Sequence, residues 1–485
     1  MSAISSSTQP SAGNRAVSTG EIDASCRVPL FVLFVSAAVW AVLASTLALI
    51  ASIKFHSPGF LADCECLTYG RVHTAALNAQ LYGFALPAGF GVSLWILARL
   101  GDGRVCQPWL IAVGGKIWNL GVLVGVLGIL VGDSTGYENL EMPRYAAVML
   151  FLGYLMIGLW TIFTFHNRSA SRLAPPQWFL LAALFWFPWI YSTANLLLVV
   201  CPVRGITQAL IAWWYSNNLT FVAFGLVGLG AIFYFIPHFL GRPLYSDCLA
   251  RFTFWTLLVF ASWCGIPNGA PLPAWIPVLS GAATLLTPVI FISIGLNIFQ
   301  TKAGVSLKTV AGSLPWFFFF GLGMFQFSGL VRIIAALPPV SAIVHFTWFT
   351  VAQSQLYANG FMAMILFGAI YYIVPRVTGI EWPMPKAVSW HFRCAVAGVV
   401  LLVLPLAVGG ILQGMRLNAQ VEFMQLTRAT LPFLRISTLG DTLLLIGQFL
   451  LSLNIIVLSV RYYRTHFVPV YEAATTQLEP AEARP

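Results

Sequence analysis

Long apolar runs separated by short polar segments follow one another along nearly the whole chain. About twelve of these runs reach the length of roughly 20 residues that carries an α-helix across the hydrocarbon core of a bilayer. Their approximate bounds are residues 28–52, 72–98, 109–132, 145–166, 177–200, 216–240, 251–270, 274–299, 311–336, 344–374, 391–413 and 439–462. The pattern predicts an all-α membrane protein built as a single bundle of about twelve transmembrane helices.

The two ends of the chain depart from this pattern. Residues 1–26 are rich in Ser, Thr and Ala and mostly polar, which predicts a disordered tail, and residues 466–485 form a second polar tail. Between them, residues 27–465 form one predicted transmembrane domain. Lys and Arg gather on one side of the predicted spans, so the positive-inside bias places both tails in the cytoplasm.

Composition and charge support a membrane protein and argue against a nucleic-acid partner. Of the 485 residues, 59% are hydrophobic and 8% are charged, whereas soluble domains carry roughly 25% charged residues. The net charge of +10 comes from basic residues spread singly along loops, as the positive-inside bias explains. Only Cys64 and Cys66 are close together among eight cysteines, and such a lone pair is weak evidence for a metal or redox site.

One apolar segment, His345–Gly379, carries two amide side chains near its start. Gln353 and Gln355 are two residues apart, so on a helix they point about 200° apart around the axis. A single helix can thereby address two separate sites, one on each flank.

Three further segments place polar side chains in or beside predicted spans. His73 begins the second span and is read either as a metal ligand or as a histidine hydrogen-bonded near the membrane interface. Asn217 opens the sixth span, and Pro267 with Asn268 ends the seventh. The segments read GRVHTAALN (residues 70–78), WWYSNN (213–218) and WCGIPNG (263–269).

These segments and their flanks resemble the catalytic subunit I of haem–copper oxidases, specifically the C-family or cbb type. The family has His-x-His where this chain has Gln353-Ser354-Gln355. One of those histidines binds the high-spin haem and the other binds the low-spin haem. His73 matches the second axial ligand of the low-spin haem.

The resemblance implies further replacements at the copper site. The family pattern Trp-Trp-Tyr-Gly-His-Asn has a copper-binding histidine where Asn217 stands, and Gly-x-His-His has two more where Pro267 and Asn268 stand. The family's redox-active tyrosine falls near Ala261. Because imidazole donors are missing at these positions, we expect no catalytic residue, no metal and no cofactor, whereas the family carries haem b and copper.

The function that follows is that of a cytochrome c oxidase subunit I-like protein of a respiratory electron-transfer complex. The resemblance implies the inner membrane of a bacterium, with membrane lipid and c-type cytochrome subunits as partners. The replaced ligands predict a structural or regulatory subunit with a degenerate active site.

Two other functions and two roles for the amides stay open. The chain could be an active terminal oxidase or nitric-oxide reductase subunit that retains haem. It could also be a transporter, for which Arg332 is the main charged side chain inside a span. The amides either join helices as polar contacts or line a polar cavity for water, lipid or quinone.

Overall fold

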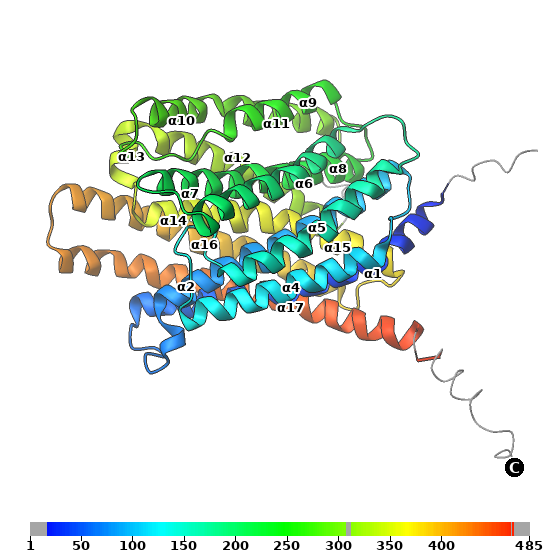
Figure 1. The fold of residues 1–485 in the computed structure, drawn as a ribbon, viewed down its shortest axis with the longest axis horizontal. Helices are drawn as coiled ribbons and strands as arrows, with labels where there is room; N and C mark the ends of the chain where they lie inside the picture. Colours follow the sequence, from blue (N-terminus) through cyan, green and yellow to red (C-terminus); the bar gives the residue numbers. More distant parts are fainter. Residues whose placement is uncertain (1–16, 307–311, 467, 470–485) are drawn as a thin grey trace, which may run out of the picture.

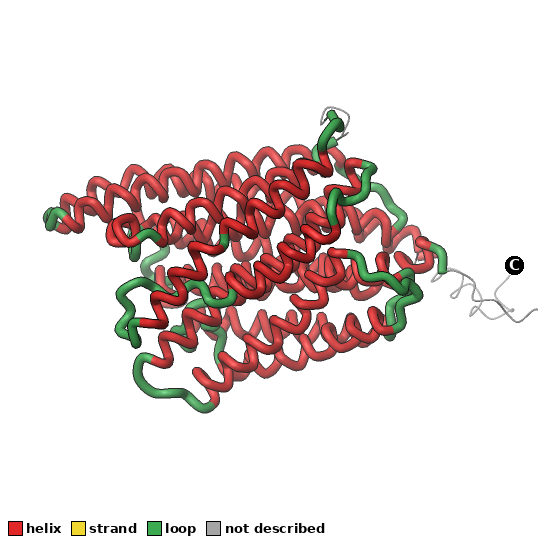
Figure 2. The backbone as a smooth tube through the Cα atoms, turned by 90° about the horizontal axis from the view of Figure 1, so that it is seen from above, coloured by secondary structure: helices red, strands yellow, loops and turns green. Residues whose placement is uncertain are grey.

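The computed structural model describes residues 17–306, 312–466 and 468–469. Within these ranges all regular structure is helical, and no strand occurs (Figure 2). The long helices run roughly parallel to one another and form a single bundle (Figure 1). The prediction of an all-α membrane bundle is confirmed.

Eleven helices in the described part of the chain are long and apolar enough to cross a membrane. The first six are α1 (Thr19–His56); α2 (Tyr69–Asn78), η2 (Ala79–Ala85) and α3 (Leu86–Gly101); α4 (Pro108–Val131); α5 (Arg144–His166); α6 (Pro175–Ala194) with η3 (Asn195–Val200); and α7 (Thr207–Asn217), η4 (Asn218–Ala223) and α8 (Phe224–Leu240). The other five are α10 (Trp275–Leu286) with α11 (Pro288–Lys302); α12 (Leu314–Ala336); α14 (Trp348–Gln355), η7 (Leu356–Ala363) and α15 (Met364–Thr378); α16 (Pro385–Asn418); and α17 (Phe423–His466).

A shorter helix accounts for the difference between eleven helices and about twelve predicted spans. The span predicted at 251–270 is α9 (Asp247–Thr256) followed by η5 (Leu257–Ala261), ten and five residues long. The chain leaves this helix at Gly265, whose φ of +97° suits glycine. Since Figure 1 places α9 toward the right and α10 toward the left, this short helix carries the chain along the bundle and completes twelve passes.

The start of α1 corrects one predicted boundary. Ser18 caps this helix, since its hydroxyl accepts from the Glu21 amide and the Glu21 carboxylate accepts from the Ser18 amide. Residues 19–26 are therefore helical, and the tail predicted to reach residue 26 ends earlier. Residues 1–16 of that tail lie outside the described residues, as do 467 and 470–485 of the C-terminal tail.

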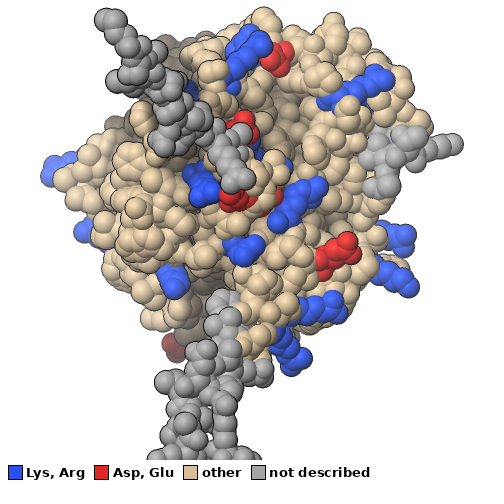
Figure 3. All heavy atoms as spheres, turned by 90° about the vertical axis from the view of Figure 1, so that its right-hand side faces the viewer, with Lys and Arg blue, Asp and Glu red and all other residues tan. Residues whose placement is uncertain are grey.

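Both described ends of the chain lie at the same end of the bundle, on the right in Figure 1. That end, turned toward the viewer in Figure 3, shows more Lys and Arg than Asp and Glu. An even number of passes and a basic end match the two features on which the predicted orientation rests. That this end faces the cytoplasm remains a prediction.

The three most buried passes each contain a π-helical segment near the middle of the bundle. In each of these three passes, 89% or more of the most apolar 18-residue stretch is buried inside the protein. In the other membrane-spanning helices that the structure describes, the buried share is 50% or less. The segments are η2, η4 and η7, and they follow Asn78, Asn217 and Gln355 directly. π-Helical turns are rare and often mark functional sites, so they draw attention to the centre of these three passes.

Three contacts hold the helices around this centre. Trp118 of α4 is fully buried and donates from Nε1 to the carbonyl of Tyr82 at 2.8 Å. The Tyr82 hydroxyl is in turn 2.6 Å from the Tyr215 hydroxyl on α7. Gly410 of α16 lies directly against the backbone of Phe349 in α14. Close packing therefore fixes the helical residues that precede η4 and η7.

Candidate functional site

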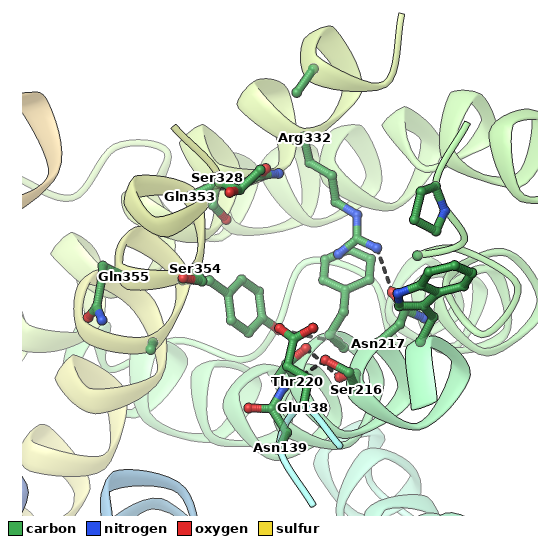
Figure 4. A pocket seen from close by; sticks show the side chains of 18 of the residues that line it. Glu138, Asn139, Ser216, Asn217, Thr220, Ser328, Arg332, Gln353, Ser354 and Gln355 are labelled. Carbon is green, nitrogen blue, oxygen red and sulfur yellow. Dashed lines mark hydrogen bonds between the residues drawn. The ribbon is translucent and has the colours of Figure 1, made fainter. Parts of the chain in front are cut away.

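A cavity of about 420 Å³ lies beside η4 and η7 (Figure 4). Its walls come from the π-helical segments η2, η4 and η7, from helices α2, α7, α8, α10, α12, α13 (Pro338–Val344) and α14, and from the loops before α5, α10 and α14. The polar side chains in its lining are those of Gln80, Glu138, Asn139, Ser216, Asn217, Thr220, Asn268, Ser280, Thr284, Ser328, Arg332, Ser341, His345, Thr350, Gln353, Ser354 and Gln355. The volume lies within the range of roughly 300–1,000 Å³ that is common for small-molecule sites.

Asn217 is buried in the wall of this larger cavity with both ends of its amide hydrogen-bonded. Its Nδ2 donates to the Ala261 carbonyl at 2.8 Å, and its Oδ1 accepts from Arg332 Nη2 at 2.5 Å. Figure 4 shows Arg332 reaching from α12 toward Asn217. The amide joins α7, η5 and α12, so at this position the polar-contact interpretation and the cavity interpretation both apply.

Arg332 has no carboxylate partner within ion-pair distance in the part of the chain that the structure describes. The ion pairs found among the described residues are Arg99–Asp23 and Arg104–Glu21. The Arg332 guanidinium instead lies over the ring of Phe221, with Cζ 4.2 Å from the ring centroid. A half-buried cation thus faces amides, hydroxyls and an aromatic ring.

Pro267 and Asn268 lie at the mouth of the same cavity, in the loop after η5. Pro267 is half-buried and Asn268 is exposed. The Asn268 amide donates from Nδ2 to the Ala336 carbonyl at the end of α12, at 3.2 Å. The structure therefore brings Asn217, Pro267 and Asn268 to one cavity, although Asn217 precedes Pro267 by 50 residues in the chain.

Gln353 and Gln355 leave different sides of α14 (Figure 4). Gln353 lines the larger cavity, whereas Gln355 lines both this cavity and a smaller one. The Gln355 Oε1 accepts from Asn359 Nδ2 at 2.6 Å, and Asn359 Oδ1 accepts from Gln80 Nε2 at 2.9 Å. A chain of three amides therefore separates the two cavities.

The smaller cavity has a volume of about 80 Å³ and brings His73 and Gln355 together. The His73 ring stacks on Tyr69, with centroids 5.3 Å apart. Tyr69 packs against Phe55, which packs against Trp348 of α14. Aromatic rings from α1, α2 and α14 therefore fill much of the space beside this imidazole.

Sequence reasoning missed several polar residues of the two cavities. Asp441 lines the smaller cavity from within α17. In the sequence it is only two residues after the predicted start of the last span at residue 439, although α17 begins at Phe423. Glu138 and Asn139 reach the larger cavity from the loop between α4 and α5. Asn139 Nδ2 donates to Ser216 Oγ at 2.6 Å. The signal in the sequence was an acidic residue close to the end of a predicted span. Hydropathy alone assigns such a residue to a surface loop.

Glu141 of the same loop is buried but does not line the cavity. Its Oε2 accepts from Asn78 Nδ2 at 2.9 Å, just before η2. Burial raises the pKa of Glu141, and desolvation by the surrounding protein also raises the pKa of Glu138. Both carboxyl groups hold a proton more tightly in the folded protein than in the unfolded chain.

We expect Glu141→Gln to flatten the pH dependence of stability. Because the folded pKa of Glu141 is raised, its stabilising contribution is complete below the unfolded pKa of about 4.3. It is lost as the pH rises through the folded pKa. Thermal unfolding of the detergent-solubilised protein between pH 4 and 8 should show a smaller fall in the variant than in the wild type.

The exposed Glu381 provides the control for this measurement, as Glu381→Gln should leave the slope unchanged. Equal slopes for Glu141→Gln and the wild type would contradict the assignment.

Residues 29–443 match the family described as Cytochrome C and Quinol oxidase polypeptide I. The chain belongs to this family. The match covers most of the twelve passes and confirms the resemblance to haem–copper oxidase subunit I at the level of the family.

Relatives in the subunit I family are spread over several bacteria. A cytochrome c oxidase subunit 1 homolog of Azorhizobium caulinodans is 24% identical over 462 residues, covering 87% of this chain and 80% of the relative. The cbb3-type cytochrome c oxidase subunit CcoN1 of Stutzerimonas stutzeri is 25% identical over 439 residues, covering 88% and 92%. A solved heme-copper terminal oxidase dimer shares the fold with a TM-score of 0.66 and 16% identity, covering 88% and 84%.

These comparisons correct our prediction that no cofactor is bound. The shared fold is that of a heme-copper terminal oxidase, and the subunit I family carries haem and copper. The prediction took replaced ligands at Gln353, Gln355 and the copper positions as sufficient evidence. Replaced residues at positions assigned by resemblance do not by themselves show that a member of this family lacks both haem and copper.

The residues present do not fit the copper and the haem of the subunit I family equally well. Among the described residues no three His, Cys, Asp or Glu side chains are grouped so that they could hold a metal ion. The Asn217 oxygen is already bound by Arg332, so the described residues around Asn217 do not fit a copper ion. His73 is the side chain that would hold a haem iron beside the smaller cavity, where haem supplies one-electron transfer.

Proposed function

We propose that this chain is a subunit I-like membrane protein of a respiratory complex whose copper site is degenerate, and that its role there is structural or regulatory. Family membership supports the respiratory assignment. The arrangement at Asn217 supports the degenerate copper site. The proposal includes one transmembrane domain with polar tails, lipid contact and c-type cytochrome subunits as partners.

The observation that carries the proposal is the Arg332 guanidinium bound to Asn217. A permanent cation lies within hydrogen-bond distance of a side chain at a copper-ligand position. Two unit charges 4 Å apart interact by about 4 kcal/mol at an effective dielectric constant of 20. For each of its positive charges, a copper ion next to Arg332 would be repelled by the guanidinium by an energy of this order. Three imidazole ligands, which could offset this repulsion, are not grouped there among the described residues.

Oxygen consumption by the purified complex tests the proposal. With a reduced c-type cytochrome as electron donor, we expect no oxygen uptake above the background rate. Asn217→Ala should leave this rate unchanged, because no copper ligand is removed. The cbb3-type oxidase of Stutzerimonas stutzeri, assayed in the same way, serves as the positive control.

The opposite result would identify an active enzyme. Oxygen uptake at a rate comparable to that of the positive control, abolished by Asn217→Ala, would show a working terminal oxidase. Uptake of nitric oxide under the same conditions would favour a reductase subunit.

A further inference from the structure

The larger cavity contains a positive charge that the described protein leaves without an anion. Arg332 uses one guanidinium nitrogen for Asn217 and lies over Phe221. Glu138 is the one acidic side chain in the lining, and it is not within ion-pair distance of Arg332. Guanidinium has five N–H donors in a planar fork, so donors remain available to a ligand.

His345 is a second donor in the same lining, and its Nε2 has no partner in residues 17–306 and 312–466. Its Nε2 is buried and makes no hydrogen bond to the described residues. Burial lowers the pKa of His345, so the ring is neutral near pH 7 and Nε2 can donate a hydrogen bond. The next residue, Phe346, has a φ of +58°, an unfavourable value for a bulky side chain.

The remaining walls suit an apolar body. Phe221, Phe349 and Tyr357 line the cavity together with Trp213 and Phe224. Small-molecule sites combine such aromatic walls with a few polar groups that fix the orientation of the ligand. A cation and a free imidazole nitrogen at one cavity match an anionic head on an apolar molecule.

We infer that the larger cavity binds an organic carboxylate, with the carboxylate head at Arg332 and His345 and the apolar body against Phe221, Phe349 and Tyr357. The inference rests on the proposed function, because a copper ion beside Asn217 would occupy the same space. A carboxylate can come from a free organic acid or from a propionate of a bound haem. The ligand of the inferred site is the free organic acid.

Benzoate binding to the detergent-solubilised complex tests the inference by isothermal titration calorimetry. Benzamide has the same ring without the charge and is the neutral control. We expect benzoate to bind at least tenfold more tightly than benzamide. Arg332→Gln should weaken benzoate at least tenfold and leave benzamide unchanged, and Arg332→Lys should retain part of the affinity. Arg428→Gln, at an exposed position of α17, should behave as the wild type.

Equal affinities for benzoate and benzamide, or unchanged benzoate binding by Arg332→Gln, would overturn the carboxylate site. If Arg332→Gln does not fold, as judged by gel filtration, the contrast between the two ligands in the wild type decides alone. Absence of benzoate binding together with a lower haem content in Arg332→Gln, measured as pyridine haemochrome, would assign Arg332 to a propionate and overturn the free-acid source.

Oxygen uptake measured on the same preparation separates the two proposals. Uptake would refute the degenerate copper site. A failed contrast between benzoate and benzamide without oxygen uptake would refute only the carboxylate site.

Discussion

Gly410→Ala is expected to disrupt the packing of α16 against α14. A Cβ at position 410 would lie 2.7 Å from the Cα of Phe349, and still closer to the Phe349 amide nitrogen. Real Cβ atoms do not approach backbone atoms this closely, so one helix must move. Overpacking of this kind costs about 1–3 kcal/mol or more, and it should lower the thermal unfolding temperature of the solubilised protein markedly.

The effect should extend to the site, because Phe349 is one turn before Gln353 and also lines the larger cavity. Gly323→Ala on α12 is the matched control, since a Cβ there would meet nothing within 4 Å. Similar unfolding temperatures for Gly410→Ala and Gly323→Ala would show that α14 and α16 are not held as the structure describes.

Trp118→Ala is expected to destabilise the protein by about 3–5 kcal/mol, the usual range for deleting a buried tryptophan side chain. Trp118 is fully buried and packs edge-on against Phe90 and Phe187. The substitution also removes the hydrogen bond to the Tyr82 carbonyl in η2. Chemical denaturation in detergent, followed by tyrosine and tryptophan fluorescence, measures the loss.

Trp109 offers a control on the same helix, because 58% of its surface is exposed. Trp109→Ala should change stability by about 0.5 kcal/mol or less, as is usual for surface positions. Comparable losses in the two variants would indicate that side-chain loss, rather than burial at the centre, determines the effect.

The bundle could be predicted from the sequence because hydropathy is a local property of each apolar run. All twelve predicted spans have a helical counterpart, including the short α9–η5 segment. Helix ends were less predictable. The structure begins α17 at Phe423, sixteen residues before the predicted start, because Arg428 and Arg435 lower the local hydropathy without breaking the helix.

The site could be predicted in part. The positions of Gln353 and Gln355 on different sides of one helix follow from helical geometry. The contact between Asn217 and Arg332 joins residues 115 apart in the chain and depends on how α7 and α12 pack. Hydropathy and motif spacing contain no information on such a pair, and they likewise missed the buried contact between Glu141 and Asn78.

The hydrogen bond between Arg332 and Asn217 makes substitutions at these two positions depend on each other. A histidine placed at position 217 would offer its ring nitrogen to the guanidinium, and a lone pair used in that way cannot also bind a metal. Removing Arg332 first would leave the Asn217 oxygen without its donor. Each single substitution is unfavourable by itself, so positions 217 and 332 are expected to tolerate change only when both are changed together.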